Sequence, residues 1–332
     1  MINDKDFQKA IELVNNSDNI LITTHARPDG DACGSVAVMH NALTARGKKV
    51  TSLLLSEIPE WYEFLFAVPP KVLGKDISFE HLMEGQLGEP DLIIIVDTNS
   101  YNQLPQFSEY LKNNNKPVMV IDHHVTTDNL GDVELIDTSA AAVSLIIFDL
   151  LKYGNWTMSE RIARALFVGI ATDTGWFRFS NADNKVYRSA AELMDAGANP
   201  TQIYHDLYQN FSLQRFNLMT AMLNTLELHF NGRYATQHLL QADFGRTGAT
   251  GKDTENLIDE CQRIGTVEVA ALFVELTDGR IKCSLRSRGA VDVRKIAQKF
   301  GGGGHTMASG VHLAGSLQNA KQLIKAEIEE QL

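Results

Sequence analysis

The sequence contains little cysteine and no long apolar run. Its three cysteines, Cys33, Cys261 and Cys283, are far apart in a chain of 332 residues and form no CxxC pair. This odd, scattered set argues against a disulfide framework and is typical of a reducing compartment. No segment approaches the roughly 18 consecutive apolar residues of a membrane helix, and the helix predicted over residues 4–16 is interrupted by charged residues, unlike a signal peptide. We therefore expect a cytoplasmic protein without a membrane partner.

Positive charge is also scarce, because the formal net charge is −11. Proteins that bind duplex DNA usually present a basic face, so this balance argues against duplex DNA as a partner. A small anionic substrate is still compatible, since bound metal ions can reverse the local sign of charge. The composition, 44% hydrophobic and 21% charged, is that of a folded protein long enough for two domains.

The pattern of apolar runs predicts an α/β fold in two domains. In the first half, NILITTH, DLIIIVDT and KPVMVIDHH alternate with helical patterns, including a helix from about Gly34. Such runs are typical of buried parallel strands, so residues 1–190 predict a mainly parallel open sheet with helices on both faces. Residues 191–228 predict a helical linker. Residues 229–332 predict a smaller α/β domain with a mixed sheet, a helix near residues 254–264 and a hairpin turned by the Asp-Gly pair at 278–279.

Titratable side chains gather where three predicted strands end. They are His25, Asp29 and Asp31 after NILITT, Asp97 after LIIIV, and Asp122, His123 and His124 at the end of VMVID. Ligands of open α/β sheets bind at the carboxyl ends of strands. Asp29 and Asp31, two apart in one predicted loop, can bind two neighbouring ions. Asp173 adds a fourth carboxylate to Asp29, Asp31 and Asp97 if its helix ends at the same edge of the sheet. A single aspartate here is typical of a helix N-cap, but the whole set predicts a metal site.

Charge balance favours two ions over one in this site. Four crowded carboxylates repel one another, and two divalent cations offset four negative charges. Mixed imidazole and carboxylate ligands favour manganese, iron or zinc, with magnesium also open, and we expect manganese. Two ions about 3.5 to 4 Å apart activate a shared nucleophile and polarise phosphoryl oxygens. The site therefore predicts hydrolysis of phosphate esters.

The motifs H-x-R-P-D-G-D, the strand-ending Asp, Asp-His-His and D-T-G-x-F resemble the four motifs of DHH phosphoesterases. The segment SLRSRGAVDVRKIAQKFGGGGHTMASG resembles the DHH-associated domain of nano-RNase/pAp phosphatases, so the resemblance covers nearly the whole chain. It implies two ligand sets bridged by Asp97, namely His25 with Asp29, and Asp31 with His123 and Asp173. It also implies that His124 faces the substrate phosphate, which makes Asp97 and His124 the predicted catalytic residues. An aspartate beside ligating imidazoles, here Asp122, more often orients them than binds the ion.

Two departures from the family pattern are visible. Cys33 stands where the family commonly has leucine, and DTSAAAVS replaces a double-serine-threonine stretch, which alters the expected phosphate contacts near Ser139. Neither departure touches a predicted ligand.

For the second domain the resemblance implies a nucleotide site. Its predicted residues are Arg286, Ser287, Gly302, Gly303, Gly304 and His305, within the loop from Gly301 to His305. A glycine run exposes backbone N–H groups to a phosphate, and an arginine adds a bidentate contact. The same run also fits a flexible turn or a helix C-cap after Phe300. In the first domain, Trp176, Phe177 and Phe179 fit either base stacking or a core role.

The resulting expectation is an enzyme that hydrolyses short single-stranded oligonucleotides to mononucleotides and removes a phosphate from 3'-phosphoadenosine 5'-phosphate. The alternatives are a cyclic or linear dinucleotide phosphodiesterase, a pyrophosphatase or exopolyphosphatase, and a non-catalytic nucleotide-binding module. The oligomeric state is open, and a homodimer is compatible with the sequence.

Overall fold

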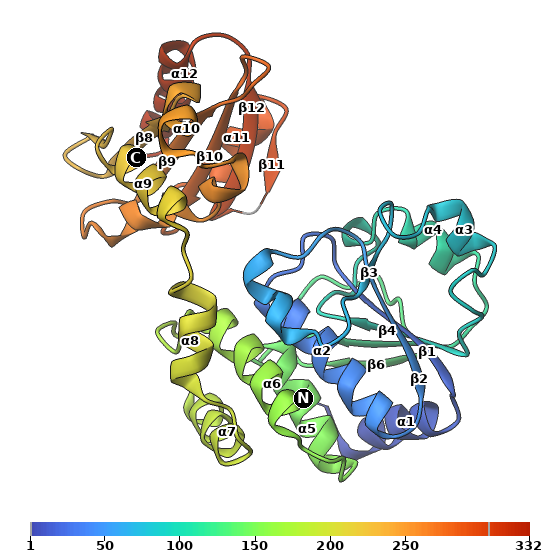
Figure 1. Cartoon of the computed structure of the whole chain (residues 1–332). Helices are drawn as coiled ribbons and strands as arrows, with labels where there is room; N and C mark the ends of the chain where they lie inside the picture. Colours follow the sequence, from blue (N-terminus) through green and yellow to red (C-terminus); the bar gives the residue numbers. More distant parts are fainter. Residues whose placement is uncertain (1, 305) are drawn as a thin grey trace. The chain divides into compact units, whose positions relative to one another are not determined.

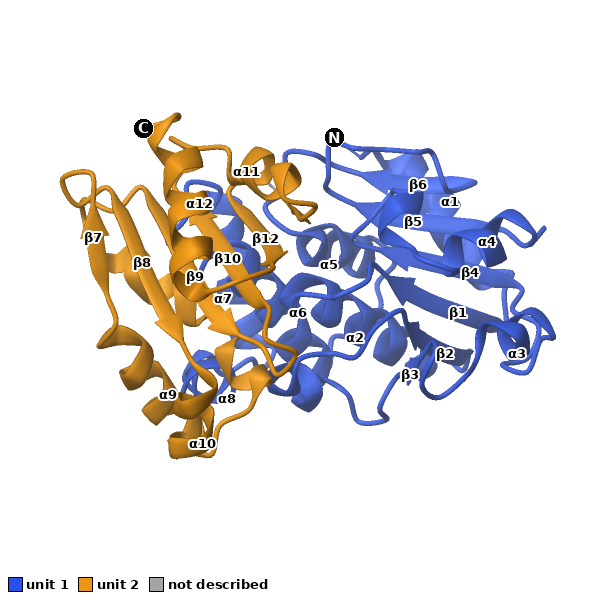
Figure 2. Cartoon of the chain, turned by 90° about the horizontal axis from the view of Figure 1, so that it is seen from above, with its two compact units in different colours: residues 1–210 blue, residues 211–332 orange. Residues whose placement is uncertain are grey.

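The chain folds into two units, the first ending at Asn210 and the second beginning at Phe211 (Figures 1 and 2). The computed structural model describes residues 2–304 and 306–332. The division lies inside the segment 191–228 for which the sequence predicts a linker. Over the described part of the chain, no helix combines the length and the apolar character needed to cross a membrane.

The first unit is built on a parallel sheet of six strands. They are β1 (Asn19–Thr24), β2 (Lys49–Leu54), β3 (Lys71–Val72), β4 (Leu92–Val96), β5 (Val118–Asp122) and β6 (Val133–Ile136). Their order is β3-β2-β1-β4-β5-β6, and every neighbouring pair is parallel. The strand order reverses between β1 and β4, and open α/β sheets bind ligands at such a reversal.

Helices cover both faces of this sheet, which confirms the predicted fold class. They are α1 (Asp4–Asn15), α2 (Gly30–Ala45), α3 (Phe79–Met83), α4 (Phe107–Lys112), α5 (Val143–Tyr153), α6 (Glu160–Asp173), α7 (Asn184–Asp195) and α8 (Pro200–Tyr208), with 3-10 turns η1 (Glu60–Leu65) and η2 (Tyr101–Gln103). Strand side chains alternate between two cores. Ile22, Ile94 and Ile121 pack with α2, α5 and α6, whereas Ile93 and Val120 pack with α3 and α4.

Helix α2 begins four residues earlier than predicted, at Gly30. Oδ1 of Asp29 accepts hydrogen bonds from the backbone N–H groups of Asp31 and Ala32, at 3.1 Å each, and so caps the helix. The prediction that Asp29 and Asp31 share one loop is therefore wrong. Asp29 is the N-cap, and Asp31 lies buried in the first turn of α2.

The second unit contains the predicted mixed sheet. Its strands are β7 (Glu227–His229), β8 (Tyr234–Leu239), β9 (Val269–Glu275), β10 (Ile281–Ser287), β11 (Gly303–Gly304) and β12 (Ala308–Leu313), in the order β11-β12-β10-β9-β8-β7. β8 and β9 are parallel, and the other neighbours are antiparallel. The predicted hairpin joins β9 to β10.

Among the described residues of this unit, four α-helices accompany the sheet. They are α9 (Leu213–Leu223), α10 (Gln241–Thr247), α11 (Val293–Lys299) and α12 (Leu317–Glu329). The helix predicted near residues 254–264 is wrong, because that segment contains the 3-10 turns η3 (Gly251–Thr254) and η4 (Leu257–Arg263). Asn256, between them, has a left-handed φ of +57° and interrupts any continuous helix.

Candidate metal centre

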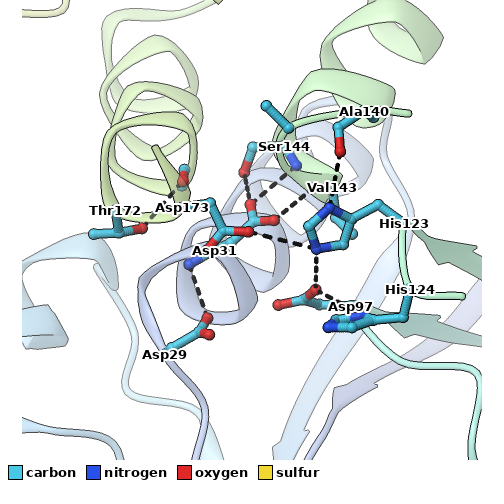
Figure 3. A network of polar contacts seen from close by, with 12 residues as sticks. Asp29, Asp31, Asp97, His123, His124, Ala140, Val143, Ser144, Thr172 and Asp173 are labelled. Atoms are coloured by element: carbon cyan, nitrogen blue, oxygen red, sulfur yellow. Dashed lines mark hydrogen bonds and ion pairs between the residues drawn. The ribbon is translucent and has the colours of Figure 1, made fainter. Parts of the chain in front are cut away.

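Three neighbouring strands deliver their polar residues to one edge of the first sheet. His25 follows β1 and Asp97 follows β4, at the reversal of strand order, while Asp122 ends β5 and His123 follows it. Two further carboxylates come from helices, because Asp31 lies in the first turn of α2 and Asp173 is the last residue of α6. Figure 3 shows the side chains of Asp31, Asp97, His123 and Asp173 converging on one point.

Glycines let α2 and α6 approach closely enough for this convergence. A Cβ added at Gly34 would lie 2.6 Å from the carbonyl oxygen of Ala165, and one at Gly30 would lie 2.4 Å from the side chain of Thr172. A Cβ at Gly169 would lie 2.5 Å from Oδ1 of Asp31. Since real Cβ atoms do not approach other atoms so closely, these positions require glycine and bring Asp31 beside the end of α6.

Asp97 is the central carboxylate of the cluster. Its Oδ2 lies 3.5 Å from Nε2 of His25, and its Oδ1 lies 3.6 Å from Nε2 of His123. The residue is 2% exposed and has a left-handed φ of +62°, a conformation held where the chain turns sharply after β4. Its Oδ1 accepts no hydrogen bond from the described residues. A buried carboxylate oxygen without a donor fits a cation ligand.

The ligand atoms fall into groups of the size that a metal ion needs. His25, Asp29 and Asp97 form one group whose ligand atoms all lie within 4.8 Å of one another, and Asp31, His123 and Asp173 form another. His124 offers a third grouping with Asp97 and His123. The first two groups contain the same residues as the two ligand sets that the family resemblance implies, with Asp97 3.6 Å from His123 of the second group.

Backbone carbonyls hold the imidazoles of His25 and His123, both predicted ligands, in one orientation. Nδ1 of His25 lies 3.0 Å from the carbonyl oxygen of Ala26, and Nδ1 of His123 lies 3.0 Å from that of Ala140. A carbonyl oxygen only accepts, so each ring donates from Nδ1 and presents the lone pair of Nε2 to the carboxylates. Metal-bound histidines are commonly oriented in this way.

The buried carboxylates of the cluster repel one another, which favours the binding of cations. Burial raises the pKa of Asp97 well above its ordinary value, and the charges of Asp31 and Asp29 raise it further. Burial likewise raises the pKa of Asp173 and of Asp31. Each shift records the cost of ionising one more carboxylate among buried like charges, and divalent cations remove that cost. The donor set and its charge therefore fit two divalent ions.

Asp122 contacts the two histidines differently. Its Oδ1 accepts hydrogen bonds from Nδ1 of His124 at 2.8 Å and from the backbone N–H of His123 at 2.8 Å. Asp122 thus orients the ring of His124, whereas the ring of His123 is oriented by Ala140. The hydrogen bond to Asp122 raises the pKa of His124, whose side chain is 47% exposed.

In the second unit, Arg286 and Ser287 already have partners. Nε of Arg286 donates to Oδ1 of Asp259 at 3.1 Å, and the arginine side chain is 27% exposed. Ser287 is 4% exposed, and its Oγ accepts a hydrogen bond from the backbone N–H of Gly289 at 3.0 Å. Ser287 therefore organises its own loop, and the guanidinium remains partly accessible.

The glycine run has two structural parts. Gly301 has φ +78°, and the N–H of Gly302 donates to the carbonyl oxygen of Ala297 at 2.8 Å, which is a helix C-cap after Phe300. The C-cap alternative is therefore confirmed for this part. Gly303 and Gly304 form β11, an exposed edge strand paired with β12. The predicted residue His305 lies outside the described residues.

The aromatic residues after Asp173 are divided between core and surface. The ring of Trp176 lies 6.0 Å from that of Phe167 and 5.0 Å from that of Tyr204, and Phe177 lies 5.5 Å from Phe167. Trp176 and Phe177 therefore pack in an aromatic network on the core. Phe179 is 56% exposed, so base stacking stays open for it alone of the three.

The sequence did not predict the residues that support the predicted ligands. Ser144 donates to Asp31, Ala140 accepts from His123, and Gly169 makes room for both side chains. A signal for the close approach was present in α2, because Gly30 and Gly34 are four apart and lie on one face of that helix. The carbonyl of Ala140 has no side-chain signal, and a serine in an apolar helix is common without any role.

Both units match models of known domain families. Residues 19–170 match the DHH family, N-terminal domain, and residues 231–331 match the DHHA1 domain. The chain is 31% identical over 320 residues to the bifunctional oligoribonuclease and PAP phosphatase NrnA of Thermus thermophilus, covering 94% of this chain and 90% of that protein. The Bacillus subtilis protein of the same name is 28% identical over 299 residues, covering 89% and 90%.

One solved structure is similar over nearly its full length. The crystal structure of an exopolyphosphatase-related protein from Bacteroides fragilis has a TM-score of 0.90 and 24% identity, covering 99% of this chain and 97% of that one. This likeness shows a shared fold. The matches to both units, together with the relative at 31% identity, confirm the resemblance drawn from the motifs. The chain therefore belongs to the DHH family of phosphoesterases, with a DHH domain followed by a DHHA1 domain.

Proposed function

We propose that this enzyme hydrolyses short oligonucleotides to mononucleotides and removes a phosphate from 3'-phosphoadenosine 5'-phosphate, using two divalent ions. The observation on which this proposal rests is the position of Asp97, within 3.6 Å of both His25 and His123, at the junction of two ligand groups. The names of the Thermus and Bacillus relatives, which cover most of both chains, support the choice of substrates.

In this proposal, His25 and Asp29 would hold one ion, and Asp97 would contribute a ligand to that ion and to a second. Asp31, His123 and Asp173 complete the second set. Manganese is the expected metal, with magnesium, iron and zinc as alternatives, because imidazole and carboxylate donors are mixed. When bound, such a pair supplies polarisation of a phosphoryl oxygen and activation of water for in-line attack.

The chain's own residues orient the substrate around this pair. His124 is fixed through Nδ1 by Asp122, which leaves its Nε2 as a donor on a half-exposed ring. The carboxylate of Asp122 favours the cationic imidazole, and a cation at this position suits a substrate phosphate. Asp97, as the shared carboxylate, sets the spacing between the two groups.

We further propose that the second unit binds the nucleotide. The supporting features are the partly exposed guanidinium of Arg286 and the exposed backbone of Gly303 and Gly304. Arg286 already pairs with Asp259 at 3.1 Å, so a phosphate would have to share or displace that carboxylate. Ser287 and Gly302 support this site indirectly, through the loop and the helix cap described above.

The test is product analysis with purified protein, manganese and four classes of substrate. A labelled dinucleotide and 3'-phosphoadenosine 5'-phosphate should both be hydrolysed, and Asp97→Ala should lower kcat/KM by about 1,000-fold, because it removes several kcal/mol of charge stabilisation. Asp18→Ala is the matched control, since that aspartate is 95% exposed and lies outside the centre. Release of phosphate from pyrophosphate, or cleavage of a cyclic dinucleotide only, would contradict the proposed substrates.

A further inference from the structure

Helix α5 begins without a cap of its own. Its N-cap residue is Ala142, whose side chain makes no capping hydrogen bond. The carboxylate of Asp31, from α2, occupies that position: Oδ2 accepts from the N–H of Val143 at 2.5 Å, and Oδ1 accepts from the N–H of Ser144 at 3.0 Å (Figure 3). Asp31 therefore caps α5 from another helix while its ligand atom groups with those of His123 and Asp173.

A serine hydroxyl also holds this carboxylate. Oγ of Ser144 donates to Oδ1 of Asp31 at 2.5 Å, and Oγ of Ser35 lies 3.4 Å from the same oxygen. Asp31, Ser35 and Ser144 are all 0% exposed, so water does not compete for these contacts. A hydrogen bond from a hydroxyl to a buried carboxylate is among the stronger ones, and the contact from Ser144 is the shorter of the two serine contacts.

The space around the Ser144 hydroxyl is closed on the side of α6. A Cβ added at Gly169 would lie 2.0 Å from Oγ of Ser144 and 2.5 Å from Oδ1 of Asp31. The hydroxyl and the carboxylate thus lie directly against the backbone of α6 at Gly169, and the hydrogen bonds from Val143 and Ser144 fix the orientation of the carboxylate. In that orientation its ligand atom lies within 4.8 Å of those of His123 and Asp173.

We propose that Ser144 is a positioning residue for the ion held by Asp31, His123 and Asp173, an inference that rests on the proposed two-ion centre. The hydroxyl fixes the carboxylate of Asp31 and so sets the affinity of that ion. The side-chain hydroxyl of Ser144 contacts Asp31 and Ser35, and among the described residues none of its hydrogen bonds goes to His25 or Asp29. Ser144 therefore affects one of the two ions selectively.

Calorimetric titration of the metal-free full chain with manganese tests this proposal. Ser144→Ala should weaken the binding of one ion by about 10- to 100-fold, the effect of removing a residue that orients a metal ligand, and leave the other within about twofold. The N–H caps on Asp31 are retained in this variant, so α5 should persist. Ser35→Ala is the matched control, because its hydroxyl is equally buried but 3.4 Å away, and it should have a smaller effect.

Steady-state kinetics give a second readout. For Ser144→Ala, a higher manganese concentration should restore kcat toward the wild-type value, since the residue acts through ion affinity. Ser144→Cys keeps the volume with a weaker donor, so it should weaken the same ion and serves if the alanine variant does not fold.

Unchanged titrations, or equal weakening of both ions, would overturn the proposal. Wild-type protein that binds fewer than two ions would also overturn it. If wild-type protein binds two ions yet cleaves no dinucleotide, the proposed function fails while the role of Ser144 is still decided by the titration.

Discussion

The candidate metal centre of the first unit and the predicted nucleotide site of the second, around Arg286 and Gly301 to Gly304, both contain residues whose types suggest phosphate chemistry, but their polar groups are satisfied to different extents. In the first unit, the polar atoms converge, and Oδ1 of Asp97 accepts no hydrogen bond from the described residues. In the second, Arg286 pairs with Asp259, and Gly301 and Gly302 close a helix. Unsatisfied buried groups therefore mark a ligand site more strongly than residue types that their own unit already satisfies.

Removal of the metal ions should produce the largest difference between the two regions. An ion present at a free concentration of about 1,000 times its Kd stabilises the folded protein by about 4 kcal/mol. Chelation should remove this stabilisation. Chelation should therefore lower the protection of backbone amides against hydrogen exchange more in the first unit than in the second, because the proposed centre lies in the first. Hydrogen exchange with and without chelator measures this. Equal loss of protection in both units would contradict the assignment.

The stability that bound metal ions add to the protein should increase with pH. The pKa values of Asp31, Asp97 and Asp173 are raised above their ordinary value of 3.8. A carboxyl with a raised folded-state pKa stabilises the fold while protonated, so the metal-free protein loses stability as the pH rises above 3.8 through the raised values. The increase in Tm on adding manganese should therefore be larger at about pH 8 than at about pH 5. An increase that is larger at the lower pH would contradict this account.

Two glycine substitutions compare the regions through packing alone. Gly169→Ala places a Cβ 2.0 Å from Oγ of Ser144 and should destabilise the protein by about 1 to 3 kcal/mol, the usual cost of overpacking a core. Gly303→Ala meets no atom within 4 Å and should change stability by less than about 0.5 kcal/mol. Urea unfolding of both variants measures this difference. Comparable destabilisation would show that the described packing around Asp31 is wrong.

The smallest expected effect on activity belongs to Arg286. Arg286→Ala should raise KM for a dinucleotide by about tenfold, the loss of roughly 1.4 kcal/mol of binding, with kcat nearly unchanged. Arg280→Ala is the matched control, because Arg280 pairs with Asp278 at the turn of the same hairpin. An unchanged KM for Arg286→Ala would remove the second unit's arginine from the proposed nucleotide site.

Much of the centre was predictable because parallel strands place their carboxyl ends at one edge. Asp97 and His123 directly follow apolar strands, so their neighbourhood follows from topology alone. The start of α2 was predicted four residues too late. Asp29 is both the N-cap of this helix and a candidate ligand, and reading it as a loop residue hid its capping role. The contact between Asp31 and α5 joins residues more than a hundred positions apart and depends on tertiary packing, which no local pattern records.

In the second unit, the hairpin was predictable from its Asp-Gly turn, whereas the glycine run was ambiguous. Four glycines permit both a helix cap and an open phosphate site, and the structure assigns Gly301 and Gly302 to the cap. The helix cap is closed by the hydrogen bond from the N–H of Gly302 to the carbonyl oxygen of Ala297. Because this is a backbone contact that follows a left-handed residue, the side chains of the segment carry no signal for it.

The number of ions bound to wild-type protein and to Asp97→Ala tests the central claim most directly. Native mass spectrometry combined with manganese electron paramagnetic resonance would count the ions and detect coupling between them. We predict two coupled ions per wild-type chain, about 3.5 to 4 Å apart, and loss of the coupling in Asp97→Ala. A single ion in the wild-type protein, or two coupled ions retained without Asp97, would contradict the account.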